Sequence, residues 1–408
     1  MGGYPGSKNW RAKLADKKSP MKVMFLCSSL EPGKDGVGDY TRLLAGACMA
    51  LGLECCLIAL HDRHVAGPAE SLEAGRMSVL RLPAIMPWSQ RIELAIAFRC
   101  QTRPDWISLQ FVSYGFDDRG CVWNLGSRLR RIVEGCRVHV MFHELWLGAY
   151  RETSWKERLI GWMQRVCILR MFRRIAPTFV TTTNSAYIAM LKMEGIRAEL
   201  LPLFGNIPIV EQPKVGWFHD ELRKAGLSVE SGGRNDCWVF ALFGTLHPVW
   251  RPEPLFSHLQ EAAKRWRKTV VIASIGRLGP GEALWAGLCR KYADAFHFLN
   301  LGERPAEQVS GFLQSADFGI AASPWELIGK SGSVAGMMEH GLPVIVSRDD
   351  VHFGRFNNDE SHHPGLTKMD AAFPARLPFL RRKPPKPVLP AEAAHFVRSL
   401  RDHSNHRL

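Results

Sequence analysis

The sequence predicts an α/β protein of two domains, each with a doubly wound parallel sheet. Short apolar runs with the length of buried strands alternate with stretches of helical period through most of the 408 residues. This alternation lapses once, in the segment 205–236, and then begins again. Glycine-rich turns also follow the first strand and open a late helix. Strands that alternate with helices form parallel sheets, whose ligands bind at the carboxyl ends of the strands.

The first domain is expected over 21–204 and opens with a β-α-β unit. Lys22–Cys27 is a short apolar run typical of a buried strand, Asp39–Leu51 has apolar side chains at helical spacing, and Cys55–Leu60 is the next strand. The later strands are expected near 78–82, at 106–110, 138–142 and 178–182, and near 200. The later helices are expected near 91–99, around 123–133, at 155–174 and near 184–193.

A linker is expected at 205–236, where prolines, glycines and charges replace the periodicity. The second domain, over 237–385, repeats the alternation with strands at 238–242, 269–275, 296–301 and 318–321 and helices near 254–266, 282–292 and 306–314. The basic tail at 1–20 is expected to be mobile. The segment 386–408 contains a helix that we expect to pack back on the first domain.

The stretch 323–346 carries the clearest indication of a ligand, because a glycine-rich turn, a helix and a buried strand follow one another closely. A helix N-terminus presents unpaired N–H groups and the positive end of the helix dipole, which favour a phosphate. An ordinary helix cap is the alternative. The residues at this helix start combine flexibility, hydroxyl groups and one cation: Gly329, Lys330, Ser331, Gly332 and Ser333.

The formal net charge of +14 indicates an anionic partner, or serves solubility alone. In 155–174, arginine and lysine interleave with tryptophan, leucine and isoleucine, which is typical of a helix lying on an anionic membrane. A core helix with a basic outer face is the alternative. No nucleic-acid-binding module is recognisable, so we expect no nucleic-acid partner.

The composition also predicts the cellular compartment of the protein and whether it needs a metal or cofactor. No apolar run of about 18 residues occurs and residues 1–20 are polar and basic, so we expect a cytoplasmic protein, peripheral on the inner face of a membrane. The ten cysteines form no CxxC pair and lie mostly inside apolar runs, which predicts reduced core residues. We expect neither a metal nor a cofactor.

Six segments occur in the predicted order over about 21–346: GVGDYTRLLAGACMALG, PDWISLQF, FHELW, LLPLFGNIP, FGTLHPVWRPEPL and SADFGIAASPWELIGKSGSVAGMMEHGLPVIV. Together these segments resemble the GT-B glycosyltransferases, most nearly the retaining, sugar-nucleotide-dependent family 4. The resemblance implies two Rossmann-like domains facing a cleft. A nucleotide-diphosphate sugar would bind to the second domain and an acceptor to the first, and catalysis would depend on stabilising charge on the leaving diphosphate.

The resemblance also assigns donor-binding residues in the second domain, although the match is uneven. Thr245 and Arg251 stand where the family commonly has an arginine and a lysine. Arg251 can grip a phosphate, and Lys330 could supply the charge that Thr245 cannot carry. The family's two glutamates are displaced: Glu326 resembles the first but lies two residues too far from the helix end, and Gly336 occupies the second position.

In the first domain, the resemblance places Gln110 where the family often has a histidine against the reacting sugar. His143, one strand later, is the alternative polar group near the reaction centre, with Glu144 able to orient it or to bind the acceptor. A histidine satisfied at a strand end is the other interpretation of His143. Gly36 and Gly38 are expected to approach the donor diphosphate from across the cleft, or simply to form a turn.

The resulting hypothesis is a glycosyltransferase of polysaccharide biosynthesis that moves a sugar, with retention, from a UDP- or GDP-sugar to a glycan, a lipid-linked glycan or a polar lipid. Two other functions stay open because the glutamates are displaced. One is a catalytically silent GT-B relative that binds a partner or glycan as a scaffold. The other is a sugar-nucleotide epimerase, which would need no acceptor.

Overall fold

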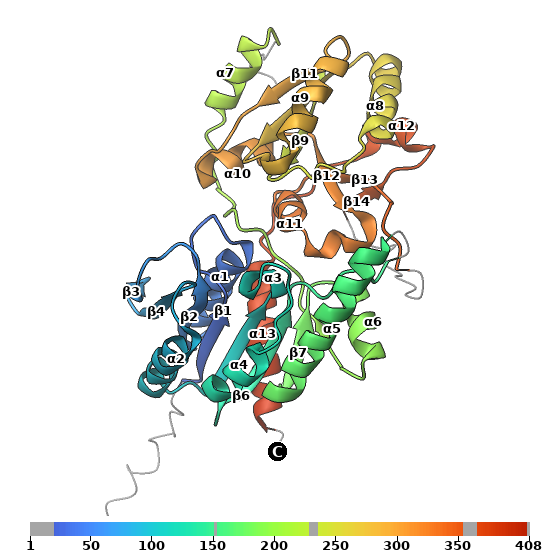
Figure 1. Ribbon diagram of the computed structural model, residues 1–408. Helices are drawn as coiled ribbons and strands as arrows, with labels where there is room; N and C mark the ends of the chain where they lie inside the picture. Colours follow the sequence, from blue (N-terminus) through green and yellow to red (C-terminus); the bar gives the residue numbers. More distant parts are fainter. Residues whose placement is uncertain (1–19, 151–152, 228–235, 354–364, 406–408) are drawn as a thin grey trace, which may run out of the picture.

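The computed structural model describes residues 20–150, 153–227, 236–353 and 365–405, which form two α/β domains (Figure 1). The fold class predicted from the sequence is confirmed, because each domain contains a largely parallel sheet flanked by helices. The basic tail expected at 1–20 lies outside the described residues, apart from Pro20.

The first domain contains an eight-stranded sheet in the order β3-β4-β2-β1-β5-β6-β7-β8. Neighbouring strands pair in parallel, except that β3 pairs antiparallel with β4 at one edge. The sequence did not predict β3 because its five residues, AESLE, lack a buried apolar run. The strands are β1 Lys22–Cys27, β2 Glu54–Asp62, β3 Ala69–Glu73, β4 Met77–Pro83, β5 Trp106–Phe111, β6 Arg137–Phe142, β7 Phe179–Thr182 and β8 Glu199–Leu200.

Helices cover both faces of this sheet, because alternate residues of its strands point to opposite sides. Met24 and Leu26 of β1 pack with α2, α4, α5 and α6, whereas Val23 and Phe25 pack with α1 and α13. The C-terminal helix α13 therefore belongs to the core of the first domain (Figure 1). The helices are α1 Gly36–Ala50, α2 Trp88–Thr102, α3 Ser113–Phe116, α4 Leu125–Val133, α5 Trp155–Ile175, α6 Ser185–Met193 and α13 Leu389–Asn405.

The second domain contains a six-stranded parallel sheet in the order β11-β10-β9-β12-β13-β14. Its strands are β9 Cys237–Phe243, β10 Thr269–Ile275, β11 His297–Asn300, β12 Phe318–Pro324, β13 Val344–Arg348 and β14 Leu366–Lys368. Its helices are α7 Gly216–Lys224, α8 Glu253–Trp266, α9 Glu282–Lys291, α10 Ala306–Ser315, α11 Gly332–Glu339 and α12 Phe373–Arg376, with 3-10 turns η2 Gly279–Gly281, η3 Trp325–Lys330 and η4 Leu377–Phe379.

Helix α7 lies inside the segment 205–236 that we expected to be a linker. Its Phe218 and Leu222 are fully buried in the core of the second domain, where the Phe218 ring meets Phe312 with ring centroids 5.0 Å apart. The helix has only nine residues, too few for a clear period in the sequence. Residues 228–235, which follow it, lie outside the described residues.

The chain crosses between the domains twice, and both crossings pass along α11. After β8 the backbone runs over this helix at Gly205, where a Cβ atom would lie 2.7 Å from the Cα of Gly336. The Glu339 carboxylate accepts the Gly205 N–H at 2.7 Å. On the return, Lys386 N–H donates to the Glu339 carbonyl at 2.8 Å. These contacts hold the middle and the C-terminal end of α11 against the two crossing segments.

Helix α5 contains the basic segment predicted to lie on a membrane. It packs through Ile168 and Met171 into the first core, while the side chains of Trp155 and Trp162 are 71% and 55% exposed. In the part of the chain that the structure describes, no helix has the length and hydropathy needed to cross a membrane.

Candidate functional site

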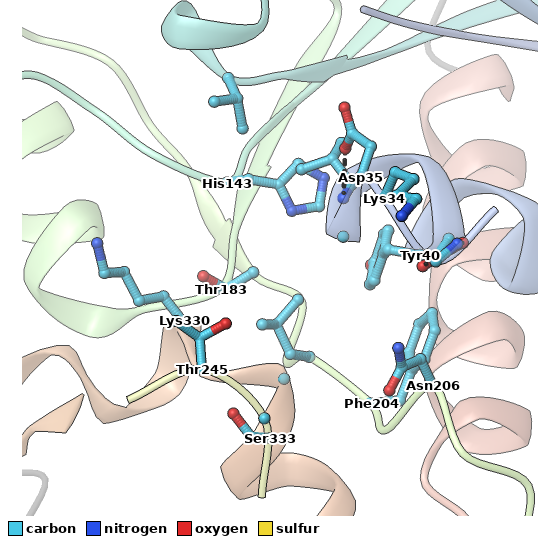
Figure 2. A pocket seen from close by; sticks show the side chains of 18 of the residues that line it. Lys34, Asp35, Tyr40, His143, Thr183, Phe204, Asn206, Thr245, Lys330 and Ser333 are labelled. Carbon is cyan, nitrogen blue, oxygen red and sulfur yellow. Dashed lines mark hydrogen bonds between the residues drawn. The ribbon is translucent and has the colours of Figure 1, made fainter. Parts of the chain in front are cut away.

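A cleft of about 750 Å³ lies between the two domains, at the carboxyl ends of strands from both sheets. This is where parallel α/β sheets bind ligands. Figure 2 shows side chains of both domains around it, from His143 and Tyr40 on one side to Thr245 and Ser333 on the other. The sequence-predicted residues that line it are Gly36, His143, Glu144, Thr245, Lys330, Gly332 and Ser333.

The second-domain side of the cleft has the geometry expected of a phosphate site. Helix α11 begins at Gly332, and its N-cap Ser331 uses the side chain to accept the Val334 N–H at 3.4 Å. Among the described residues no acceptor meets the N–H groups of Gly332 and Ser333. The end of β9 closes this corner, because a Cβ on Gly244 would lie 3.6 Å from the Ser333 Oγ. An anion here would meet N–H groups and the positive helix end.

Lys330 lines the cleft but is held by the first domain. Its Nζ lies 3.2 Å from the Glu144 Oε1, and the side chain points away from Ser333 in Figure 2. Burial alone would lower the pKa of Lys330, but the adjacent Tyr187 and Glu144 outweigh it and hold the pKa above its usual value. The lysine therefore stays charged, and its charge is shared with a carboxylate.

Arg277 is a cleft cation that the sequence interpretation missed. It lies two residues after the end of β10 and donates from Nη2 to the Gly33 carbonyl of the first domain at 2.7 Å. Its Nε also pairs with Glu303, and about half of the side chain is exposed. The sequence could have pointed to Arg277 by its position after the carboxyl end of a predicted strand, where a parallel sheet presents its binding groups.

Two of the acidic groups that line the cleft, Asp35 and Asp39, accept hydrogen bonds from backbone N–H groups. Asp35 caps α1 by accepting the N–H groups of Val37 at 2.9 Å and Gly38 at 3.0 Å, and Asp39 accepts the Gly33 N–H at 3.0 Å. Lys34 directly precedes Asp35 and also lines the cleft. Because N–H groups offset the carboxylate charges, the cleft can still attract an anionic ligand.

His143 lies at the end of β6 and is 7% exposed. Its Nε2 is 2.9 Å from the Gln110 Oε1, and its ring meets the Tyr40 ring edge-on at 4.9 Å between centroids. Tyr40 in turn stacks on Phe204 at 4.4 Å. Burial lowers the pKa of His143 to about 3, so the imidazole is neutral at physiological pH.

Solved structures resemble this arrangement, although no family model and no curated protein sequence matches the chain. A glycosyltransferase from Rickettsia africae gives a TM-score of 0.56 at 10% identity, over 95% of this chain and 100% of that one. HepE from Anabaena, in complex with UDP-glucose, gives 0.51 at 14% identity, over 94% and 91%. The UDP-GlcNAc 2-epimerase from Methanocaldococcus jannaschii gives 0.51 at 11% identity, over 94% and 100%.

The fold is GT-B. At identities of 10% to 14%, the likeness shows the architecture alone. The activity therefore has to be inferred from the residues of the cleft.

Other predicted residues lie outside the lining of the GT-B cleft. Arg251 is exposed in the loop before α8. Glu326 uses its carboxylate to accept the Phe353 N–H at 2.7 Å. Gln110 is 1% exposed and reaches the cleft only through His143. Ser331 is the cap of α11 and lies in a neighbouring hollow.

Two predicted glycines serve backbone packing in this GT-B structure. A Cβ on Gly38 would lie 2.6 Å from the Ser29 carbonyl oxygen, and a Cβ on Gly329 would lie 2.8 Å from that of Thr183. Neither lines the cleft. At Gly336, where the family resemblance expected a glutamate, a Cβ would lie 3.3 Å from the Phe243 ring and 4.0 Å from the Cα of Gly205.

Proposed function

We propose that this protein is a glycosyltransferase that moves a sugar, with retention, from a UDP- or GDP-sugar to a glycan, a lipid-linked glycan or a polar lipid. The observation that carries the proposal is the open N-terminus of α11 in a cleft between two GT-B domains, facing His143 across the gap. The structural likeness to HepE in complex with UDP-glucose supports the same class of donor.

The donor diphosphate would bind at the start of α11. The N–H groups of Gly332 and Ser333 and the Thr245 hydroxyl supply donors. Arg277 supplies a positive charge, because it lines the cleft and about half of its side chain is exposed. Lys330 adds a second charge once the phosphate competes with Glu144. Arg277 thus replaces Arg251 in the donor site that we expected from the sequence, since Arg251 does not line the cleft.

In the reaction, an acceptor hydroxyl bonds to the anomeric carbon while the bond from that carbon to the diphosphate oxygen breaks. The hydroxyl proton passes to the leaving diphosphate, which departs from the face on which the acceptor arrives. Fixed donors around the diphosphate stabilise its growing charge, which lowers the barrier. His143 is neutral and hydrogen-bonds to a sugar hydroxyl, and Glu144 binds the acceptor.

An acceptor at a membrane is supported by α5. Its exposed face carries Trp155, Leu159 and Trp162 beside exposed Arg170, Arg173 and Arg174. Tryptophan prefers the membrane interface, and arginine is attracted to anionic lipids. The protein would then work in the cytoplasm on the inner face of a membrane, in polysaccharide biosynthesis.

The test is calorimetry with UDP, GDP and ADP, followed by a screen of nucleotide sugars for turnover with and without acceptors. We expect UDP or GDP to bind and the matching sugar nucleotide to be hydrolysed slowly without an acceptor. If none of the three nucleotides binds, the proposal is wrong.

Two other functions are each favoured by one observation. Glu326 is occupied by the Phe353 N–H, and glycine stands at position 336, where the family resemblance expects a glutamate. Both observations favour a silent scaffold, and such a protein would bind no nucleotide. The likeness to a UDP-GlcNAc 2-epimerase favours a sugar-nucleotide epimerase, which would convert its substrate to an isomer with no acceptor present.

A further inference from the structure

A continuous chain of hydrogen bonds runs inside the first sheet to His143. The Thr181 Oγ1 lies 2.8 Å from the His139 Nε2, and the His139 Nδ1 lies 2.9 Å from the Ser108 Oγ. The Gln110 Nε2 donates to the Ser108 Oγ at 2.8 Å, and the Gln110 Oε1 lies 2.9 Å from the His143 Nε2. The chain thus joins β7, β6 and β5 and ends at the cleft.

The Thr181 end of this chain fixes the direction of its hydrogen bonds. Thr181 donates its hydroxyl to the Met141 sulfur at 2.9 Å, so its oxygen accepts from the Nε2–H of His139. The Nδ1 of His139 then lacks a proton and accepts the Ser108 hydroxyl, which itself accepts from the Gln110 amide. The amide oxygen of Gln110 is left to accept from Nε2–H of His143.

The hydrogen-bonding groups of this chain are buried from solvent, so water cannot satisfy a group that points the wrong way. Ser108 and His139 are fully buried, Gln110 is 1% exposed and Thr181 is 3% exposed. Around His139 lie the rings of Phe179, at 4.4 Å, and Phe396, at 5.0 Å. A single reversed group would leave a buried donor or acceptor unpaired, so the chain has to reverse as a whole or not at all.

We propose that Thr181, His139, Ser108 and Gln110 are positioning residues that hold His143 in the Nε2–H tautomer, so that its Nδ1 presents a hydrogen-bond acceptor to the cleft. In the described part of the chain, no group donates to that nitrogen, while His143 lines the cleft. The ligand group that it suits is a hydroxyl, which donates to Nδ1; a carbonyl or phosphate oxygen would meet a lone pair and be repelled.

The identity of that hydroxyl, on a donor or acceptor sugar, rests on the proposed function, but the tautomer does not. It can be measured by long-range proton–nitrogen NMR correlation on the protein with labelled histidine, with a His143→Gln variant to assign the signal. We expect a protonated Nε2 and an unprotonated Nδ1. A protonated Nδ1 in the unaltered protein would overturn the proposal.

The remote end of the chain provides the sharper test. Thr181→Val removes the acceptor for the Nε2–H of His139, and reversal of the whole chain relieves that buried donor. We therefore expect His143 to shift toward the Nδ1–H tautomer in this variant. Thr182→Val is the matched control, because Thr182 is the next residue, is fully buried and donates only to the Phe142 carbonyl at 2.9 Å. An unchanged His143 tautomer in Thr181→Val would show that Thr181 and His139 are merely structural.

Two variants at Gln110 complete the set. Gln110→Glu keeps an acceptor for Nε2–H and should preserve the tautomer, whereas Gln110→Leu should give a mixture of both. If nucleotide sugars are turned over, Thr181→Val should lower kcat/KM about tenfold, the size of one hydrogen bond, with Thr182→Val unaffected. If no nucleotide binds but the tautomer is as stated, the proposed function fails and this inference stands.

Discussion

The Nζ of Lys330 lies 3.2 Å from the carboxylate of Glu144, which joins the turn before α11 of the second domain to the end of β6 of the first. Both side chains are about one third exposed and both line the cleft. A diphosphate at the start of α11 would compete with this carboxylate for the lysine. Donor binding would therefore weaken a contact that joins the two domains.

The first prediction follows from this competition. Glu144→Gln removes the competing charge and should tighten UDP binding about fivefold, since a partly exposed ion pair contributes roughly 1 kcal/mol. Lys330→Met should weaken UDP binding. Calorimetry measures both, and equal affinities for the parent and Glu144→Gln would mean that Lys330 does not reach the phosphate.

Arg277 should contribute more to donor affinity than Arg251. Arg277→Ala is expected to weaken UDP binding about tenfold or more, because a charged group that pairs with phosphate is worth roughly 1.5–3 kcal/mol. Arg251→Ala is the matched control and should leave the affinity nearly unchanged, since Arg251 lies outside the cleft. The opposite ranking of the two variants would restore the assignment made from the sequence.

Gly205 should be intolerant of a side chain. In Gly205→Ala the new Cβ would lie 2.7 Å from the Cα of Gly336, so the crossover would have to shift, at a cost of about 1–3 kcal/mol. Gly46→Ala on α1 is the control: its Cβ meets nothing within 4 Å, and alanine in a helix should stabilise by roughly 0.5–1 kcal/mol. Thermal unfolding should show a lowered Tm for the first variant and an unchanged or raised one for the second.

Glu339 should make stability fall as pH rises. Burial raises its pKa to about 7 from a usual value of 4.5, although the backbone donors of Gly205 and Val388 oppose the shift. Between these two pKa values the folded protein binds a proton that the unfolded chain releases. The contribution of this proton to the free energy of unfolding is therefore complete below pH 4.5 and is lost as pH rises to about 7.

The Glu339→Gln variant isolates this effect, because an amide keeps an acceptor for the Gly205 N–H and does not ionise. The free energy of unfolding of the parent, relative to this variant, should decrease by up to about 3 kcal/mol across that window. Parallel stability profiles for the two proteins would show that Glu339 ionises normally.

The membrane proposal predicts that α5 binds anionic vesicles. Changing Arg170, Arg173 and Arg174 together to glutamate should abolish flotation with vesicles rich in anionic lipid, because each basic residue near the surface contributes about 1 kcal/mol. The control reverses three exposed cations of the second domain, Lys264, Arg265 and Arg267, with the same change in net charge. Equal loss in both variants would indicate a general charge effect without a role for α5.

The strands and most helices could be predicted because their signals are local. β1 and β10 have the predicted bounds, and the helix after Ser331 ends near Gly341, whose φ of +82° suits glycine alone. β3 and α7 could not be predicted, because one is an exposed edge strand and the other is short. Both form only because a neighbouring strand or core is present to pair with or to cover them.

Local patterns in the sequence were enough to predict the α/β class, the order of most elements and the helix start after Ser331, because periodicity, glycine and N-cap chemistry act within a few residues of the chain. Which side chains share the cleft depends on tertiary contacts. The tertiary structure brought Arg277 in and left Arg251 and Glu326 out, paired Lys330 with Glu144, and aligned Thr181, His139, Ser108 and Gln110 behind His143. These relationships depend on parallel register and on the two crossings between domains, which no local spacing in the sequence specifies.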